Sequence, residues 1–253
     1  MLSQDFFNDE FLEERVDTFY GYGNYKGNYW FIGMEERGED FQDIEKRINI
    51  WSNRGRCEID DVAEYHEAIG YGASFQPGAK AKLDVPVWRS IIRIVLSAKG
   101  TENIHIKDVR EYQTNELGRK DKETCLLELF TLPSLSRKYW IYNEYSQLPF
   151  LSTRKTYEDY CVETRINHIR QRIQEHQPKA VVFYGRAFEY FWRKITENIT
   201  NIEFTKPSES SLEDFFISRN NQTVFVMAKF PRALPNEYFH NIGRAIAAKI
   251  AEK

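Results

Sequence analysis

FIGMEERGED, residues 31–40, is the stretch on which the fold assignment turns. The apolar residues before Gly33 are typical of a buried strand, yet the chain then presents Glu35, Glu36 and Arg37, with two more acidic residues close behind. A solvated turn before a helix is one interpretation of these charges. The other is a functional site at the end of a core strand, and the rest of the sequence favours it.

Three further apolar runs predict core strands: CLLELF (125–130), AVVFYG (180–185) and TVFVMAKF (223–230). With NYWFIG (28–33) they make four strands, and helical patterns lie around and between them at 4–19, 41–51, 59–69, 85–100, 157–176, 186–199 and 237–251. Strands that alternate with helices imply a mainly parallel sheet with both faces covered. We therefore expect an α/β fold, a three-layer α/β/α arrangement with a mainly parallel central sheet.

The ends of these elements carry the usual signals. Asp84 is the expected N-cap of the helix at 85–100, which has Pro86 in its first turn and Gly100 at its end. Pro133 and Ser134 are expected to close the strand that begins at residue 125. No linker or repeat interrupts the chain, so a single domain over residues 1–253 is expected, with residues 1–27 as an N-terminal helical extension.

Composition restricts the class of protein. The chain is 42% hydrophobic and 29% charged, as in soluble globular proteins, and it contains no apolar run of the ~18 residues that span a bilayer. The acidic N-terminus lacks the pattern of a signal peptide. The three cysteines are widely spaced, which argues against disulfides and metal clusters. We expect a cytoplasmic protein that does not associate with membranes.

The charges are unevenly distributed along the chain. Residues 1–70 carry 17 acidic against 7 basic side chains, whereas residues 71–253 carry 21 acidic against 28 basic ones. A protein polarised in this way can turn its basic side to phosphates. Scattered solvated charges are the alternative.

Five short motifs follow one another on the predicted elements: GMEER (33–37), GASFQPG (72–78), CLLEL (125–129), VVFYGR (181–186) and FPRAL (230–234). In this order they resemble the motifs of the uracil-DNA glycosylase superfamily, α/β enzymes that flip a base out of DNA and cleave its glycosidic bond. The resemblance covers residues 28–251. It implies a monomer that acts on double-stranded DNA containing a modified or damaged base, without metal or cofactor.

The first motif would supply the catalytic carboxylate. Glu35 takes the position of the family's Asp or Asn, and Glu36 is the alternative if the alignment shifts by one residue. A carboxylate there can stabilise the cationic sugar and orient the attacking water. Gly33, Met34 and Arg37 would contact the base. The competing interpretation is that both glutamates are surface residues of a turn.

Two further positions would bind the flipped base. Phe75 matches the stacking Phe of the family, although a Phe in such a loop is often part of the core. Glu128 stands where the family has a base-reading Asn, and a carboxyl group suits the N4 amine of cytosine. A protonated Glu128 could also donate to N3. The alternative for Glu128 is a buried residue paired with an arginine such as Arg93.

The remaining assignments concern DNA contacts. Leu234 would wedge into the duplex, unless it only packs the last helix. Arg37 or Arg232 would hydrogen-bond a polar 5-substituent on the base, because the bulky residue that shields this position in the family is missing. The expected DNA contacts are Phe230, Pro231, Arg232, Leu234, Arg186 and Lys229, with Arg154 and Lys155 as further phosphate ligands.

These features favour a monofunctional DNA glycosylase that acts on a 5-modified cytosine, such as a hydroxymethylated or glucosylated one. Such bases occur in phage DNA, so antiphage defence is a hypothesis. A uracil or mismatched-thymine glycosylase of base excision repair is one alternative. A nucleic-acid-binding protein of the same fold without catalysis is another, and hydrolysis of a free nucleotide is a third.

Overall fold

The computed structural model describes residues 6–77, 85–199, 202–207, 214–231 and 234–252. Within these residues seven strands form one sheet, in the order β3-β1-β4-β2-β5-β7-β6. The strands are β1 (Gly21–Gly23), β2 (Tyr29–Arg37), β3 (Ile59–Asp60), β4 (Thr124–Ser134), β5 (Ala180–Tyr184), β6 (Phe216–Arg219) and β7 (Val224–Ala228).

The four predicted strands are β2, β4, β5 and β7, and they form the parallel centre of the sheet. The short strands flank them: β1 runs antiparallel to β4, and β6 runs antiparallel to β7. The prediction of an α/β fold with a mainly parallel sheet is confirmed. A difference lies near the N-terminus, where β1 joins the sheet from within the stretch expected as a helical extension.

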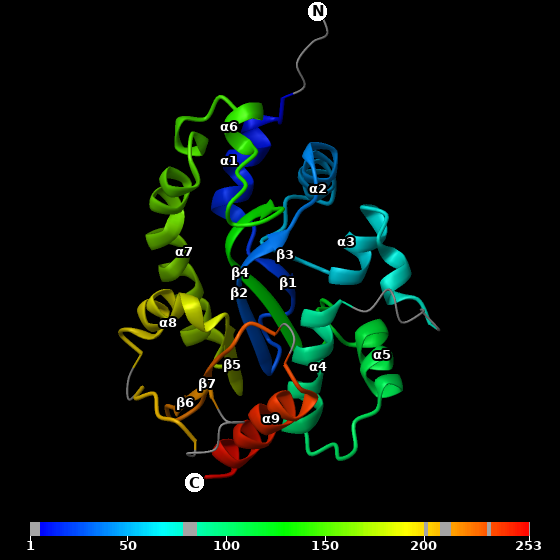
Figure 1. Ribbon diagram of the computed structural model, residues 1–253, viewed down its shortest axis with the longest axis vertical. Coiled ribbons are helices and arrows are strands. Elements are labelled where there is room, and N and C mark those ends of the chain that lie inside the picture. Colours follow the sequence, from blue (N-terminus) through cyan, green and yellow to red (C-terminus); the bar gives the residue numbers. More distant parts are fainter. Residues whose placement is uncertain (1–5, 78–84, 200–201, 208–213, 232–233, 253) are drawn as a thin grey trace, which may run out of the picture.

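Helices cover both faces of this sheet (Figure 1). They are α1 (Asp9–Thr18), α2 (Phe41–Asn53), α3 (Val62–Ala68), α4 (Pro86–Ala98), α5 (Ile106–Asn115), α6 (Tyr142–Tyr145), α7 (Arg154–His176), α8 (Glu189–Thr196) and α9 (Asn236–Ala251). One core lies between the sheet and α1, α7 and α8, and the other lies under α3, α4, α5 and α9. Alternate residues of β2 serve the two cores: Trp30 and Ile32 enter the first, and Phe31 enters the second. We refer to these as the α7 side and the α4 side of the sheet.

Two strands are longer than their sequences predicted. β2 continues through Glu35 to Arg37 instead of ending at Gly33, and its pairing with β4 shifts register between Glu35 and Arg37. β4 likewise runs through Pro133 to Ser134. The charges of the opening stretch therefore stand at the carboxyl end of β2 itself. Asp40 then caps α2, because its side chain accepts a hydrogen bond from the Asp43 N–H at 2.9 Å.

β4 extends beyond its neighbour β1, and side chains of α7 bond to backbone groups of β4 that β1 does not reach. β1 pairs with β4 only as far as Leu127. Beyond it, the Arg165 guanidinium donates to the carbonyl oxygens of Glu128 and Leu129, and the Tyr157 hydroxyl accepts from the N–H groups of Thr131 and Leu132. Side chains thus satisfy backbone groups that a longer strand would have paired.

The other helix ends agree with most of the predicted signals. α4 begins at Pro86 and ends before Gly100, whose φ is +81°. The proposed cap Asp84 lies outside the described residues. α7 begins three residues earlier than predicted, at Arg154, with Thr153 as its cap. The polar helix α5, which buries only Val109, Tyr112 and Gln113, was not predicted.

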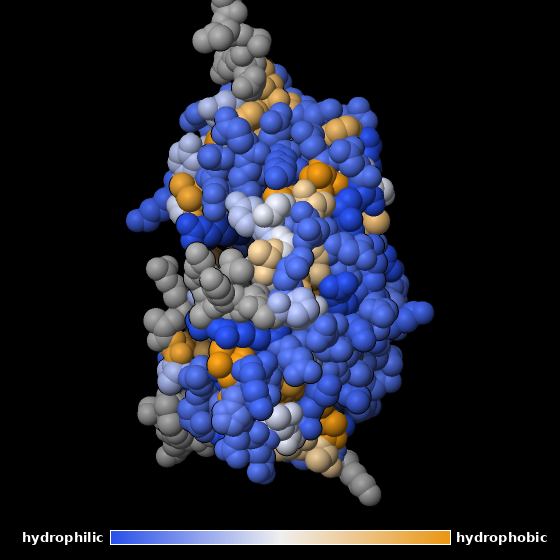
Figure 2. All heavy atoms as spheres, turned by 90° about the vertical axis from the view of Figure 1, so that its right-hand side faces the viewer, coloured by the Kyte–Doolittle hydropathy of each residue, from blue (hydrophilic) through white to orange (hydrophobic). Residues whose placement is uncertain are grey.

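Figure 2 shows the outer surface of the α3, α4, α5 and α9 layer, which is mainly hydrophilic with hydrophobic side chains in small separate patches. Within the described part of the chain, every helix is too short or too polar to cross a bilayer.

Candidate functional site

β2, β4 and β5 place Gly33, Glu128 and Tyr184 in one row, which lies at the carboxyl end of β5 and midway along β2 and β4. Gly33 of β2 is the register partner of Glu128 on β4, and Ile32 pairs with Phe183, the residue before Tyr184 on β5. In open α/β sheets, ligands bind beyond the carboxyl ends of the strands. The row therefore borders this edge of the sheet at the end of β5, where β2 and β4 continue past it to Arg37 and Ser134.

Glu128 carries the most unusual chemistry in this row. Its Oε1 accepts a hydrogen bond from the Tyr184 hydroxyl at 3.2 Å, and its Oε2 is buried without a hydrogen-bond partner among the described residues. Burial raises the pKa of Glu128 to about 8, and the charges of Glu36 and Glu35 add to this effect. Glu128 is therefore mostly a neutral acid at pH 7. Arg93 donates to the Ile104 carbonyl instead, so the alternative of a Glu128–Arg93 pair is wrong.

Gly33 allows the two side chains to meet. A Cβ atom at this position would lie 2.3 Å from the Tyr184 hydroxyl oxygen and 2.6 Å from Glu128 Oε2. Both distances are far below van der Waals contact, so any larger residue would displace these polar groups. Gly33 thus provides space rather than a side-chain contact.

Glu36 belongs to a buried polar cluster on the α4 side. Its carboxylate accepts hydrogen bonds from the Tyr22 hydroxyl at 3.1 Å and from Arg47 Nη1 at 2.8 Å. His66 Nε2 on α3 lies 3.9 Å from Glu36 Oε1. Arg47 is held in turn by Asp43, whose Oδ2 accepts from Nε at 2.9 Å. The cluster fixes the direction of the Glu36 side chain.

Glu35 turns to the opposite side of the sheet. Its Oε2 accepts from Arg154 Nη1 at 2.5 Å and lies 3.8 Å from Arg137 Nη1. Burial raises the pKa of Glu35, although the two arginines oppose this shift. Arg154 also donates to Ser134 Oγ and to carbonyl oxygens after β4, so few of its N–H groups remain to bind a phosphate. The expectation of Arg154 as a phosphate ligand is not supported.

An aromatic group packs beside Glu36. The His66 ring lies 5.6 Å from the Phe75 ring and 5.2 Å from the Trp88 ring, and Phe75 and Trp88 are 5.1 Å apart. Phe75 is 8% exposed, so its faces are largely occupied, as expected of a core residue. Trp88 in the first turn of α4 is more exposed and offers a second flat surface.

Basic side chains gather at the ends of β5 and β7. Asp214 is the shared partner of Arg186 and of Lys229, whose Nζ lies 2.7 Å from Asp214 Oδ2, and Lys206 Nζ lies 3.9 Å from Oδ1. Three cations thus face one carboxylate. Phe230, next to Lys229, is 50% exposed and lies 6.2 Å from the Tyr184 ring. The structure therefore brings the predicted contacts Arg186, Lys229 and Phe230 together.

The other predicted contacts are dispersed. The Met34 side chain is buried in the core on the α7 side, on the opposite face of the sheet from the Glu128 side chain. Arg37 is exposed at the end of β2, and Pro231 is buried. Leu234 is partly buried against the core on the α4 side, which agrees with the packing alternative. Arg232 lies outside the described residues.

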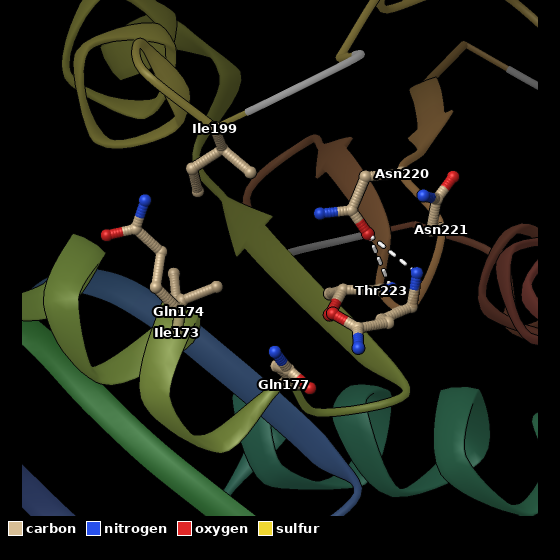
Figure 3. A pocket seen from close by; sticks show the side chains of 8 residues that line it. Ile173, Gln174, Gln177, Ile199, Asn220, Asn221 and Thr223 are labelled. Carbon is tan, nitrogen blue, oxygen red and sulfur yellow. Dashed lines mark hydrogen bonds between the residues drawn. The ribbon is translucent and has the colours of Figure 1, made fainter.

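A pocket of about 330 Å³ lies at the other end of the sheet (Figure 3). Its walls come from the end of α7 and from the turn between β6 and β7, and the residues drawn are Ile173, Gln174, Gln177, Ile199, Asn220, Asn221, Gln222 and Thr223. The Asn220 side chain accepts from the N–H groups of Gln222 and Thr223, as the dashed lines show. None of these described lining residues titrates near neutral pH, so the pocket lacks groups for acid–base chemistry.

Several residues of the site were missed by the sequence analysis: Tyr22, Arg47, His66, Trp88, Tyr184 and Asp214. Tyr184 had a detectable signal, since it is a hydroxyl-bearing residue at the carboxyl end of a predicted core strand. The others come from elements whose positions around the sheet depend on long-range packing.

Comparison with known proteins does not place the chain in a family. No protein-family model matches this chain, and no curated protein matches it. The class of the protein thus rests on its fold and site: a mixed α/β protein with a mostly parallel sheet and a cluster of acids and aromatic rings around the carboxyl halves of its central strands.

Proposed function

We propose that the protein is a DNA glycosylase that hydrolyses the N-glycosidic bond of a 5-modified cytosine and leaves an abasic site. One observation carries this proposal: the Glu128 carboxyl group is buried beside Tyr184, the last residue of β5, and burial raises its pKa to about 8. The resemblance of the motif order to the uracil-DNA glycosylase superfamily supports it independently of that geometry.

A neutral carboxylic acid is complementary to one edge of cytosine. Its O–H group can donate to N3, while its carbonyl oxygen accepts from the N4 amine. When the C1′–N1 bond breaks, its electron pair moves into the base, and the Glu128 proton can pass to N3. Base release is then assisted by an acid, which typically contributes a factor of about 10²–10⁴.

Glu36 is the carboxylate we assign to the sugar. It lies on the side of the sheet that carries Phe75 and Trp88, and its charge adds more to the pKa shift of Glu128 than the charge of Glu35 does. A carboxylate there stabilises the positive charge that develops at C1′. Glu35, held by Arg154 from the α7 side, serves to join β2 to α7.

The exposed residues at this edge suit DNA. Arg186 and Lys229 would contact phosphates, with exposed Phe230 at the duplex surface. Exposed Arg37 would meet the 5-substituent of the base. A requirement for that substituent would protect normal cytosine, because polar groups of the site stay unpaired without it. Modified cytosines of this kind in phage DNA make antiphage defence the proposed setting.

Uracil or mismatched thymine is the second candidate. A neutral acid also complements the N3–H and O4 groups of these bases, with the donor and acceptor roles exchanged. The chemistry of Glu128 therefore does not separate cytosine from uracil by itself, and the substrate panel must contain both.

The test is strand breakage by alkali after incubation with duplex DNA that contains uracil, cytosine, hydroxymethylcytosine or glucosylated hydroxymethylcytosine. Breakage confined to a modified-cytosine DNA is expected, with activity that falls as the pH rises through about 8, where Glu128 ionises. Glu128→Gln should keep KM within a few-fold and lower kcat by about 10² or more, because Gln presents the same donor and acceptor but transfers no proton.

Paired variants assign the carboxylates. Glu36→Gln should lower kcat by about 10² or more, and Glu35→Gln should lower it much less. Breakage confined to uracil DNA would discard the cytosine assignment, and silence on every DNA with retained binding would favour the non-catalytic binding protein.

A further inference from the structure

The protonation state of His66 follows from its neighbours. Nδ1 lies 2.7 Å from the carbonyl oxygen of Val62, one helical turn earlier. A carbonyl oxygen only accepts hydrogen bonds, so Nδ1 must carry a proton. Burial lowers the pKa of His66, and the neighbouring charges are Glu36 from β2 and Asp43 and Arg47 from α2. Neutral His66 therefore presents the lone pair of Nε2 towards Glu36.

The distance between His66 Nε2 and Glu36 Oε1 allows one water molecule to bridge the two atoms. Nε2 and Glu36 Oε1 are 3.9 Å apart, which is too far for a direct hydrogen bond. Both atoms are acceptors, so they cannot bond to each other. One water molecule about 2.8 Å from each can donate a hydrogen bond to both. Its oxygen lone pairs then point away from the two acceptors.

We infer that His66 and Glu36 together hold the attacking water, and that His66 is the base that takes its proton. This inference rests on the proposed function. The water oxygen forms a bond to C1′, the C1′–N1 bond breaks, and its electron pair goes to the base. The water proton goes to His66 Nε2 and the Glu128 proton goes to N3, so the charges balance. His66 returns its proton to solvent, and Glu128 takes one from solvent.

His66→Asn is the main test, because Asn retains a side-chain N–H donor towards Val62 and has no basic nitrogen. The assay uses the DNA whose base the wild type excises. On this substrate we expect kcat of His66→Asn to fall about 10²-fold or more, while KM and DNA affinity stay within a few-fold of the wild-type values. The loss of wild-type activity at acidic pH, caused by protonation of His66, should disappear in the variant. His240→Asn is the matched control, a partly buried helical histidine on α9, and its kcat should stay within about twofold of the wild type.

An NMR measurement separates this inference from the proposed function. ¹⁵N shifts of the histidine rings should show His66 neutral with the proton on Nδ1 at pH 7, whether or not a substrate is known. A proton on Nε2, or an Asn variant that keeps the rate and the acidic limb of the wild type, would overturn the role of His66 alone. A wild type that binds DNA but excises no base would overturn both proposals.

Discussion

Glu128 is a residue whose ionisation opposes folding. Its pKa in the folded protein is about 8, above the usual value of 4.5 for a Glu side chain, because the carboxyl group is buried and, within the described part of the chain, only the Tyr184 hydroxyl donates to it. The stability due to neutral Glu128 is fully present below about pH 4.5 and is lost as the pH rises through 8.

Replacement of Glu128 by Gln should therefore remove a pH dependence. Between pH 4.5 and 9, the free energy of unfolding of the wild type should fall relative to Glu128→Gln by on the order of 3–5 kcal/mol, since each pKa unit corresponds to about 1.4 kcal/mol. Urea unfolding across this range measures the difference. Glu163→Gln, at an exposed ion pair with Lys194, is the control and should change stability by at most about 1 kcal/mol. A parallel pH dependence in the wild type and Glu128→Gln would contradict the raised pKa.

The choice between Glu35 and Glu36 shows where residue patterns stop being informative. Simple alternation along β2 would put Glu35 on the same face as Gly33. The structure departs from this alternation: Glu35 meets Arg154 of α7 and Glu36 meets His66 of α3, next to a register shift between Glu35 and Arg37. Such an irregularity leaves no mark in the string of residues itself, and the sequence therefore left both carboxylates open.

At the scale of the element, α7 and β4 depend on each other through Arg165. This fully buried guanidinium donates to the carbonyl oxygens of Glu128 and Leu129 and to those of Val16 and Phe19 near the end of α1. Its hydrogen-bond acceptors among the described residues are carbonyl oxygens rather than carboxylates. Its charge is accommodated instead by four oxygen atoms and by the ring of Tyr20, 4.0 Å away.

Arg165→Met should be strongly destabilising, because Met fills similar space but leaves four buried carbonyl groups unpaired. We expect the free energy of unfolding to fall by about 3–5 kcal/mol. Arg193→Met removes an exposed ion pair with Glu189 one turn away and should cost only about 0.3–0.5 kcal/mol. Equal losses in the two variants, measured by chemical denaturation, would contradict the role of Arg165.

The elements themselves differed in how well sequence predicted them. The four central strands are continuous apolar runs, as buried parallel strands usually are, and all four were found. β1 and β3 have only three and two residues, and the glycines of β1 give no apolar pattern. α5 is mostly polar, so its short buried stripe did not stand out. The extra length of β4 depends on α7, which no local pattern can report.

At the scale of the whole molecule, the uneven charge distribution predicts salt-dependent DNA binding. Among the described residues, Arg186, Lys206 and Lys229 share the carboxylate of Asp214, so two positive charges of this group are in excess and are proposed to meet phosphates.

Arg186→Gln and Lys229→Gln should each make the slope of log affinity against log salt concentration shallower by about 0.9, the effect of one phosphate contact. Fluorescence anisotropy with a labelled duplex measures this slope. Lys249→Gln is the control, since Lys249 pairs with Glu252 at the far end of α9, and its slope should match the wild type. Equal slopes in all four proteins would mean that DNA does not bind at this edge.

The cover that α7 places over β4 also matters when two molecules meet. A bare strand edge offers N–H and C=O groups to any other extended chain, and this is how many proteins begin to aggregate. Beyond the end of β1, Arg165 and Tyr157 already occupy those groups on β4. A second molecule therefore finds these four backbone groups already bonded, and this part of the strand that carries Glu128 is protected from intermolecular pairing.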